Sequence, residues 1–177
     1  MMNDGSENRT RVILYTDGAC APNPGPGGWA YILKDEKSGR AKEESGGERG
    51  TTNNRMEMMA VIRGLEALKR PCAVEVVSDS EYVVNGIESL GIYVATRFHR
   101  SANSRKLIKN AELWKRLADA AAKHSVTVRW VRGHVGHPEN EKCDLLATYE
   151  ANRIAQEPSP VKDSGIESLF EAEESAD

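Results

Sequence analysis

The order in which strand-like and helical patterns follow one another constrains the fold of this 177-residue chain more than any other feature. Three strand-like runs come first, separated only by turn residues, and this arrangement predicts antiparallel hairpins. The two later strand-like runs are each preceded by a helical pattern, as expected for parallel strands joined through helices. The chain is therefore expected to form an α/β fold: a five-stranded mixed sheet, three antiparallel then parallel strands, with helices on both faces.

Individual elements are expected where β-branched residues, helix caps and apolar periodicity mark them. The strands are expected at residues 12–16, 29–34, 41–50, 73–77 and 126–131. The first helix is expected to follow one of several possible caps at residues 51–54 and to run to about residue 69. Further helices are expected at residues 81–88, 110–123 and 141–155. Gly46 and Gly47 weaken the prediction of the third strand. The first strand is expected to stop at the Asp17-Gly18 turn signal, and residues 21–28 are expected to form a turn.

Charge divides the chain into a basic body and an acidic tail. The whole chain carries −3, but residues 157–177 contain seven acids and one base and carry −6, so that residues 1–156 carry +3. We expect a disordered leader over residues 1–10, one globular domain over residues 11–155 and an acidic, disordered tail over residues 156–177.

Composition excludes several classes of protein. No run of about 18 apolar residues is present, so neither a membrane span nor a membrane partner is expected. The N-terminus MMNDGSENRTR lacks the apolar core of a secretory signal. The chain has an odd number of cysteines, Cys20, Cys72 and Cys143, which argues against a disulfide framework. They form no CxxC motif, which argues against a zinc ribbon. We expect a cytoplasmic protein.

Glu57 is the most informative single residue. Val61, Gly64, Leu65 and Leu68 follow it at helical spacing and form an apolar stripe, so Glu57 is expected to face the sheet rather than water. A buried carboxylate is costly unless a cation or a proton compensates it. The alternatives are an exposed helix face and an internal salt bridge.

Asp17 and Asp79 are each expected at the end of a strand, where open α/β sheets bind their ligands. A plain turn at Asp17-Gly18 is one alternative. Capping of the next helix by Asp79 is another, although Ser80 can cap that helix equally well.

Asp144 lies in the first turns of the predicted last helix. Ala147, Thr148 and Ala151 lie on the same side, and their small size allows close packing that leaves the carboxylate near the sheet. The alternative is a favourable charge near a helix N-terminus.

These four acids can converge on one point. Because clustered carboxylates repel one another, the cluster requires hard cations, and oxygen ligands favour Mg²⁺ or Mn²⁺. Two such ions about 4 Å apart clamp a phosphate for in-line attack by water. His134 and His137, with Cys143 nearby, match no strong zinc pattern. They are expected as surface histidines or as a proton carrier beside the metal site.

Four sequence blocks carry a resemblance to a known family. They are TDGACAPNPGPGGWAYIL, TTNNRMEMMAVIRGLEAL, VVSDSEYV and WVRGHVGHPENEKCDLLA, and they extend over roughly residues 11–155. In order, spacing and context they resemble the signature blocks of bacterial type 1 ribonuclease H. The resemblance implies a ribonuclease H-like fold, a catalytic domain over residues 11–155 and a monomer. It also implies endonucleolytic cleavage of the RNA strand of RNA–DNA hybrids with two Mg²⁺ ions, or Mn²⁺ as a substitute, leaving 3′-hydroxyl and 5′-phosphate ends.

The resemblance also assigns roles to residues of the site. Asp17, Glu57, Asp79 and Asp144 stand where the family has its catalytic, metal-binding carboxylates. His134 stands where the family has a flexible-loop histidine that helps proton transfer or product release.

Substrate contacts follow from the same resemblance. Asn23, Asn53 and Asn54 match minor-groove contacts, where 2′-hydroxyls distinguish RNA from DNA. Thr52 matches a residue that holds a phosphate of the DNA strand. Glu81 stands where the best-known members have glutamine, and its charge disfavours nearby phosphates, so we leave it out of the binding set.

Residues 89–111, the basic segment, contain five cations and no acid. The cations are Arg97, Arg100, Arg105, Lys106 and Lys109. The segment resembles the basic protrusion of the family, although Tyr93 and Phe98 stand where better-known versions have several tryptophans. A solvated surface loop is the alternative. We expect the DNA strand to contact all of these cations except Arg105.

Two alternative functions belong to the same fold. One is a non-catalytic hybrid-binding module, but four intact carboxylates would repel a polyanion in the absence of metal ions. The other is a different nuclease of the ribonuclease H-like superfamily, which the dense GHVGHPENE block and the compact size disfavour.

Overall fold

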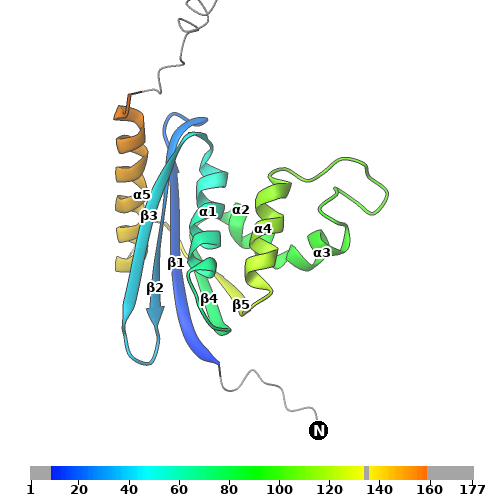
Figure 1. Cartoon of the computed structure of the whole chain (residues 1–177), viewed down its shortest axis with the longest axis horizontal. Coiled ribbons are helices and arrows are strands. Elements are labelled where there is room, and N and C mark those ends of the chain that lie inside the picture. The colour runs from blue at the N-terminus through cyan, green and yellow to red at the C-terminus, as the bar shows by residue number, and fades with distance from the viewer. Residues whose placement is uncertain (1–8, 134–135, 159–177) are drawn as a thin grey trace, which may run out of the picture.

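The computed structural model describes residues 9–133 and 136–158, which form one five-stranded sheet with helices on both faces (Figure 1). The strands are β1 (Thr10–Cys20), β2 (Gly25–Asp35), β3 (Ala41–Thr51), β4 (Cys72–Ser78) and β5 (Ser125–Trp130). The helices are α1 (Asn53–Glu66), α2 (Glu81–Glu88), α3 (Leu90–Ala95), α4 (Ala111–Ala121) and α5 (Pro138–Gln156). No helix in these two stretches is long and apolar enough to cross a membrane.

The strand order β3-β2-β1-β4-β5 confirms the predicted mixed sheet. β1 pairs with β2 and β2 with β3 in antiparallel fashion, whereas β1 with β4 and β4 with β5 are parallel pairs. Short loops join the antiparallel strands. Helices lie between the parallel ones, because a parallel connection has to return along the sheet.

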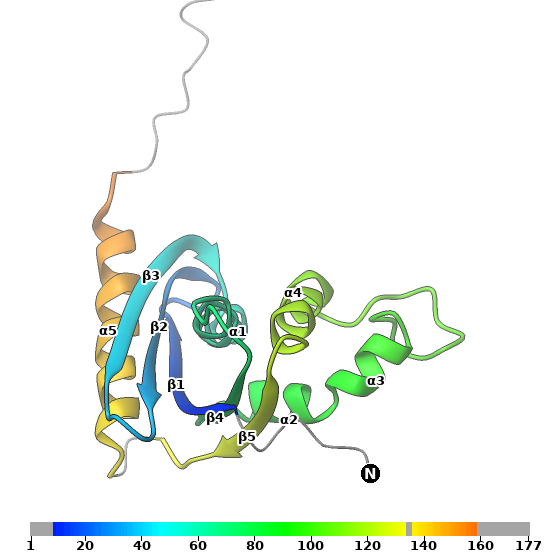
Figure 2. The same ribbon diagram turned by 60° about the horizontal axis from the view of Figure 1, so that its bottom comes forward.

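Helix α1 covers one face of the sheet with α4 packed beside it, and α5 covers the other face (Figure 2). Under α1 and α4 lies the larger apolar core, in which Leu14, Ile62 and Leu117 are buried. A smaller core lies under α5 and includes Cys143 and Ala147. The predicted apolar stripe of α1 is confirmed, since its side chains form part of the larger core.

The predicted end of the first strand is wrong. β1 continues through Cys20, because residues 17–20 remain paired with β2, and Asp17 itself pairs with Ala30. The predicted turn over residues 21–28 is correspondingly shorter, since β2 already begins at Gly25. An Asp-Gly signal marks a turn only where no neighbouring strand competes for its backbone hydrogen bonds.

β3 forms a full strand despite its two glycines. A Cβ atom added at Gly46 would lie 2.6 Å from the Trp29 ring, and one at Gly47 would lie 2.6 Å from the Ile154 side chain. The glycines therefore make room for neighbouring side chains instead of interrupting the strand.

Two helical predictions also need correction. α3 was not predicted, and none of its residues is buried, so it lacks the apolar periodicity that marks a helix. α5 starts three residues before the predicted start, with Pro138 in its first turn, a favourable place for proline. Thr148 is exposed, so only Ala147 and Ala151 form the predicted small-residue face.

Candidate active site

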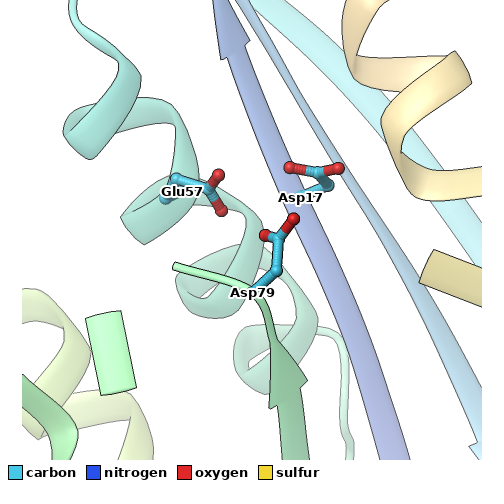
Figure 3. A group of neighbouring side chains, drawn as sticks. All are labelled: Asp17, Glu57 and Asp79. Carbon is cyan, nitrogen blue, oxygen red and sulfur yellow. The ribbon is translucent and has the colours of Figure 1, made fainter. Parts of the chain in front are cut away.

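Three of the four predicted acids meet beyond the end of the β1–β4 pair (Figure 3). Asp17 lies on β1, Glu57 on α1, and Asp79 directly after β4. One carboxylate oxygen from each residue lies within 4.8 Å of the others. Asp17 and Glu57 are buried, and Asp79 is half-buried. The fold thus gathers three acids that are far apart in the sequence.

Backbone geometry explains why these acids meet. The parallel pairing of β1 with β4 ends at Tyr15 and Val77, so the two strands separate shortly before Asp17 and Asp79. Gly18 lets α1 approach β1 closely, because a Cβ atom there would lie only 2.3 Å from the backbone nitrogen of Glu57. The prediction that Glu57 faces the sheet is confirmed, since the residue is only 8% exposed.

Burial and mutual repulsion raise the pKa of two of these acids. The pKa of Asp17 is raised to about 7, mainly by burial and then by the charge of Asp79, while a hydrogen bond with Glu57 opposes the shift. The pKa of Glu57 is raised well above its ordinary value, mainly by burial and then by the charges of Asp17 and Asp79. Without a cation, the cluster therefore retains protons near neutral pH.

The donor set fits a hard divalent cation. Its three members offer carboxylate oxygens, the ligand atoms that Mg²⁺ and Mn²⁺ prefer. Glu57 Oε2 is buried and has no hydrogen-bond partner within the described part of the chain. A buried acceptor without a donor is costly, and a coordinated cation removes that cost.

Asp144 lies on α5, outside this group of three. It is half-buried, and its charge contributes to the raised pKa of Asp17, so it acts on the same site. His134 falls outside the described residues. Neither His137 nor Cys143 joins a group of three metal-ligating residues in the ranges 9–133 and 136–158.

The predicted minor-groove and phosphate contacts gather at the start of α1. The Thr52 side chain caps this helix by accepting a hydrogen bond from the Arg55 backbone nitrogen at 3.3 Å. Asn23 Oδ1 accepts one from the Asn53 backbone nitrogen, also at 3.3 Å. The structure therefore brings Asn23 to Thr52, Asn53 and Asn54, although the turn and the helix lie 30 residues apart.

The basic segment projects from the body as α3 and the loop that follows it (Figures 1 and 2). All of its cations are exposed. Its base packs on the body through Tyr93, whose ring centroid lies 5.5 Å from that of Trp114. The structure thus places these cations on a projection that is attached at its base to α4.

Sequence reasoning missed a polar connection between this segment and α1. Asn110 Oδ1 accepts a hydrogen bond from Arg55 Nη1 at 3.4 Å, and Asn110 Nδ2 donates to the Tyr82 hydroxyl at 3.0 Å. Asn110 has a left-handed backbone with φ 56°. Asparagine tolerates this conformation well. An asparagine directly before a helical pattern is therefore the signal that could have indicated a left-handed residue at position 110.

Fold and site together define the class: an α/β protein with a cluster of carboxylates, suited to a divalent cation, where two parallel strands separate. Comparison with known proteins gives the family. The RNase H family model matches residues 9–152. The sequence is 51% identical over 142 residues to ribonuclease H from Nitratidesulfovibrio vulgaris, covering 80% of this chain and 90% of that protein. It is 53% identical over 139 residues to ribonuclease HI from Caulobacter vibrioides, covering 77% and 90%.

A solved structure agrees with these sequence relatives. LC11-RNase H1, solved in complex with an RNA/DNA hybrid, superimposes with a TM-score of 0.64 at 26% identity, over 81% of this chain and 99% of that one. The chain therefore belongs to the RNase H family and is a ribonuclease H of the bacterial type 1 group.

Proposed function

We propose that this ribonuclease H cleaves the RNA strand of RNA–DNA hybrids endonucleolytically, with two Mg²⁺ ions, to leave 3′-hydroxyl and 5′-phosphate ends. The observation that carries the proposal is the cluster formed by the buried acids Asp17 and Glu57 and the half-buried Asp79. Without metal ions, such concentrated negative charge would repel a nucleic acid. The hybrid bound to LC11-RNase H1 supports the substrate.

Asp17, Glu57 and Asp79 would hold the metal, and Asp144 would complete the site from α5. When bound, two Mg²⁺ ions polarise the scissile phosphate and activate the attacking water. The task of the protein is to keep the carboxylates in place and the site partly dry. Asp17 and Glu57 are buried, which keeps water away from their carboxylates. Their attraction for a cation is stronger there than in bulk water.

Substrate selection lies beside the cluster. Asn23, Asn53 and Asn54 present amide groups near the start of α1, where they can hydrogen-bond 2′-hydroxyls that only the RNA strand carries. Thr52 lies at the N-terminus of the same helix, where the positive end of the helix dipole favours a phosphate of the DNA strand. We propose that the RNA strand binds on the side of the acids.

The basic segment holds the DNA strand at a second place. Arg97, Arg100, Lys106 and Lys109 are exposed on a projection without acids, so they attract phosphates in a sequence-independent way. His134 carries protons for the leaving group or helps product release. We also propose that the protein acts in the cytoplasm and as a monomer.

The proposal is tested by incubating end-labelled RNA–DNA hybrid, duplex RNA and duplex DNA with the protein, in Mg²⁺ or in EDTA. We expect cleavage of the hybrid alone, in its RNA strand alone, and only with Mg²⁺. The product ends are read by whether a 3′-hydroxyl accepts ligation. Cleavage in EDTA, or equal cleavage of duplex DNA, contradicts the proposal.

A further inference from the structure

The backbone of Asp79 is held differently from those of the other two acids of the cluster. Asp17 lies within β1 and Glu57 within α1, so the regular hydrogen bonds of a strand and a helix fix both. Asp79 lies between the end of β4 and the start of α2 and belongs to neither. Because the three carboxylates repel one another, an acid on such a connection moves away unless neighbouring groups hold it.

The last residue of β5 and the three residues that follow it, residues 130–133, hold this connection. The Trp130 indole Nε1 donates a hydrogen bond to the backbone oxygen of Asp79 at 3.1 Å. The backbone nitrogen of Val131 donates to the backbone oxygen of Ser78 at 3.0 Å. Trp130 is 48% exposed, so burial alone does not explain its position. The hydrogen bond from its indole N–H to the backbone of Asp79 explains that position instead.

Gly133 approaches the same acid from the carboxylate side. A Cβ atom added at Gly133 would lie 2.6 Å from Asp79 Oδ2, closer than real contacts allow. The backbone of Gly133 is not in the left-handed region, where only Gly39 and Gly136 occur among the described glycines. Conformational freedom therefore does not explain this glycine, whereas the space taken by the Asp79 carboxylate does.

We propose that Trp130 and Gly133 are positioning residues that keep Asp79 in the geometry required for metal binding. Trp130 fixes the backbone of Asp79, and Gly133 leaves the room that its carboxylate occupies. The proposal rests on the proposed metal-dependent function and extends it to two residues that supply no metal ligand. Such supporting contacts matter because ligand geometry sets the affinity for the metal.

The direct test measures Mg²⁺ binding to the nucleic-acid-free protein by calorimetry, together with kcat and KM on hybrid. We expect Gly133→Ala to weaken Mg²⁺ binding by about 10-fold or more, as for other losses of support around a metal ligand. Trp130→Phe keeps an aromatic ring but loses the N–H donor, and a loss of about fivefold is expected for one hydrogen bond. KM for hybrid stays unchanged in both.

Gly50→Ala is the matched control, because a Cβ atom added there meets nothing within 4 Å and the backbone is not left-handed. We expect it to bind Mg²⁺ like the unaltered protein. If Gly133→Ala fails to fold, Trp130→Phe decides alone, since this ring lies at the surface.

A double-mutant cycle tests the contact without metal. Gly133→Ala displaces the end of the Asp79 side chain and should therefore change the stability of the metal-free protein. The change should be much smaller in an Asp79→Ala background, where the oxygen that the new methyl group meets is absent. The remaining contact, to the Cβ atom of residue 79 at 3.6 Å, is an ordinary one. An equal change in stability in both backgrounds contradicts the assigned contact.

The outcomes separate this proposal from the function on which it rests. Unchanged Mg²⁺ affinity in both variants, with an unaltered protein that binds Mg²⁺ and cleaves hybrid, overturns the positioning role alone. An unaltered protein that neither binds Mg²⁺ nor cleaves hybrid overturns the proposed function as well.

Discussion

At the scale of single residues, the active-site cluster holds charge that destabilises the metal-free fold. The pKa of Asp17 is raised to about 7, so the folded state binds more protons than the unfolded state between about pH 4 and pH 7, and stability falls as pH rises through this window. Asp17→Asn removes that charge. We expect a higher Tm for the metal-free variant at pH 8, by ~2–4 °C for each kcal/mol relieved. An unchanged or lower Tm in thermal melts contradicts this.

A second prediction at this scale concerns His134. If it carries protons, His134→Ala slows kcat by about 10²-fold without ending cleavage. Single-turnover rates and calorimetric Mg²⁺ binding measured on the same samples distinguish the possible roles. Loss of all activity together with loss of metal binding would identify His134 as a metal ligand instead.

Sequence reasoning succeeded for residues whose burial depends on neighbours in the same element. The stripe formed by Val61 and Leu65 lies on the helix of Glu57, so helical spacing alone predicts the burial of that acid. The position of Asp17 within β1 depends on its partner Ala30 in β2, and a turn signal carries no information about that pairing. The support given by Gly133 comes from a segment 54 residues away from Asp79 and has no signal in the sequence.

At the scale of elements, the cations of the basic segment can be replaced without disturbing the core, because all of them are exposed. Replacing Arg97, Arg100, Lys106 and Lys109 with alanine should raise KM for hybrid far more than it lowers kcat, because these side chains are exposed and none belongs to the carboxylate cluster. The slope of log K against log salt should flatten by up to about 0.9 for each lost phosphate contact. An unchanged KM at low salt would show that the segment is a surface loop that does not contact the hybrid.

The element that sequence reasoning missed, α3, and the strand that it predicted only weakly, β3, lack a periodic pattern of their own. In α3 the exposed apolar residues Ile92 and Val94 stand next to the half-buried Tyr93, so apolar residues mark no single face of this helix. β3 contains two glycines that make room for the side chains of Trp29 and Ile154, which belong to other elements. Strands and helices with a local apolar pattern were predicted to within a few residues.

At the scale of the whole molecule, metal binding should reverse the pH dependence that the cluster imposes. The raised pKa of Asp17 predicts that the metal-free protein loses stability as pH rises from about 4 to about 7, and the raised pKa of Glu57 acts in the same direction. Mg²⁺ binds the ionised, folded form, so it should raise Tm at pH 8.5, by an amount equivalent to about 2.7 kcal/mol at 100 times its Kd. Melts of Asp17→Asn provide the comparison, and an equal Mg²⁺ effect in that variant argues against binding at the cluster.

The overall topology was predictable because connection length alone separates antiparallel from parallel pairs. Three strands without helices between them gave the hairpins β1–β2–β3, and the later helices gave the parallel strands β4 and β5. The projection of the basic segment from the body and the contacts of residues 130–133 with Asp79 depend on how distant parts pack, which no local pattern encodes.

The most direct test of the central claim, that the buried carboxylates form the metal site that cuts RNA, compares the unaltered protein with Asp17→Asn. The measurement is the rate of RNA-strand cleavage in a labelled hybrid at saturating Mg²⁺, with circular dichroism to show that both are folded. We predict cleavage by the unaltered protein and none above background by a fully folded Asp17→Asn. Cleavage by Asp17→Asn at a rate close to that of the unaltered protein would contradict the claim.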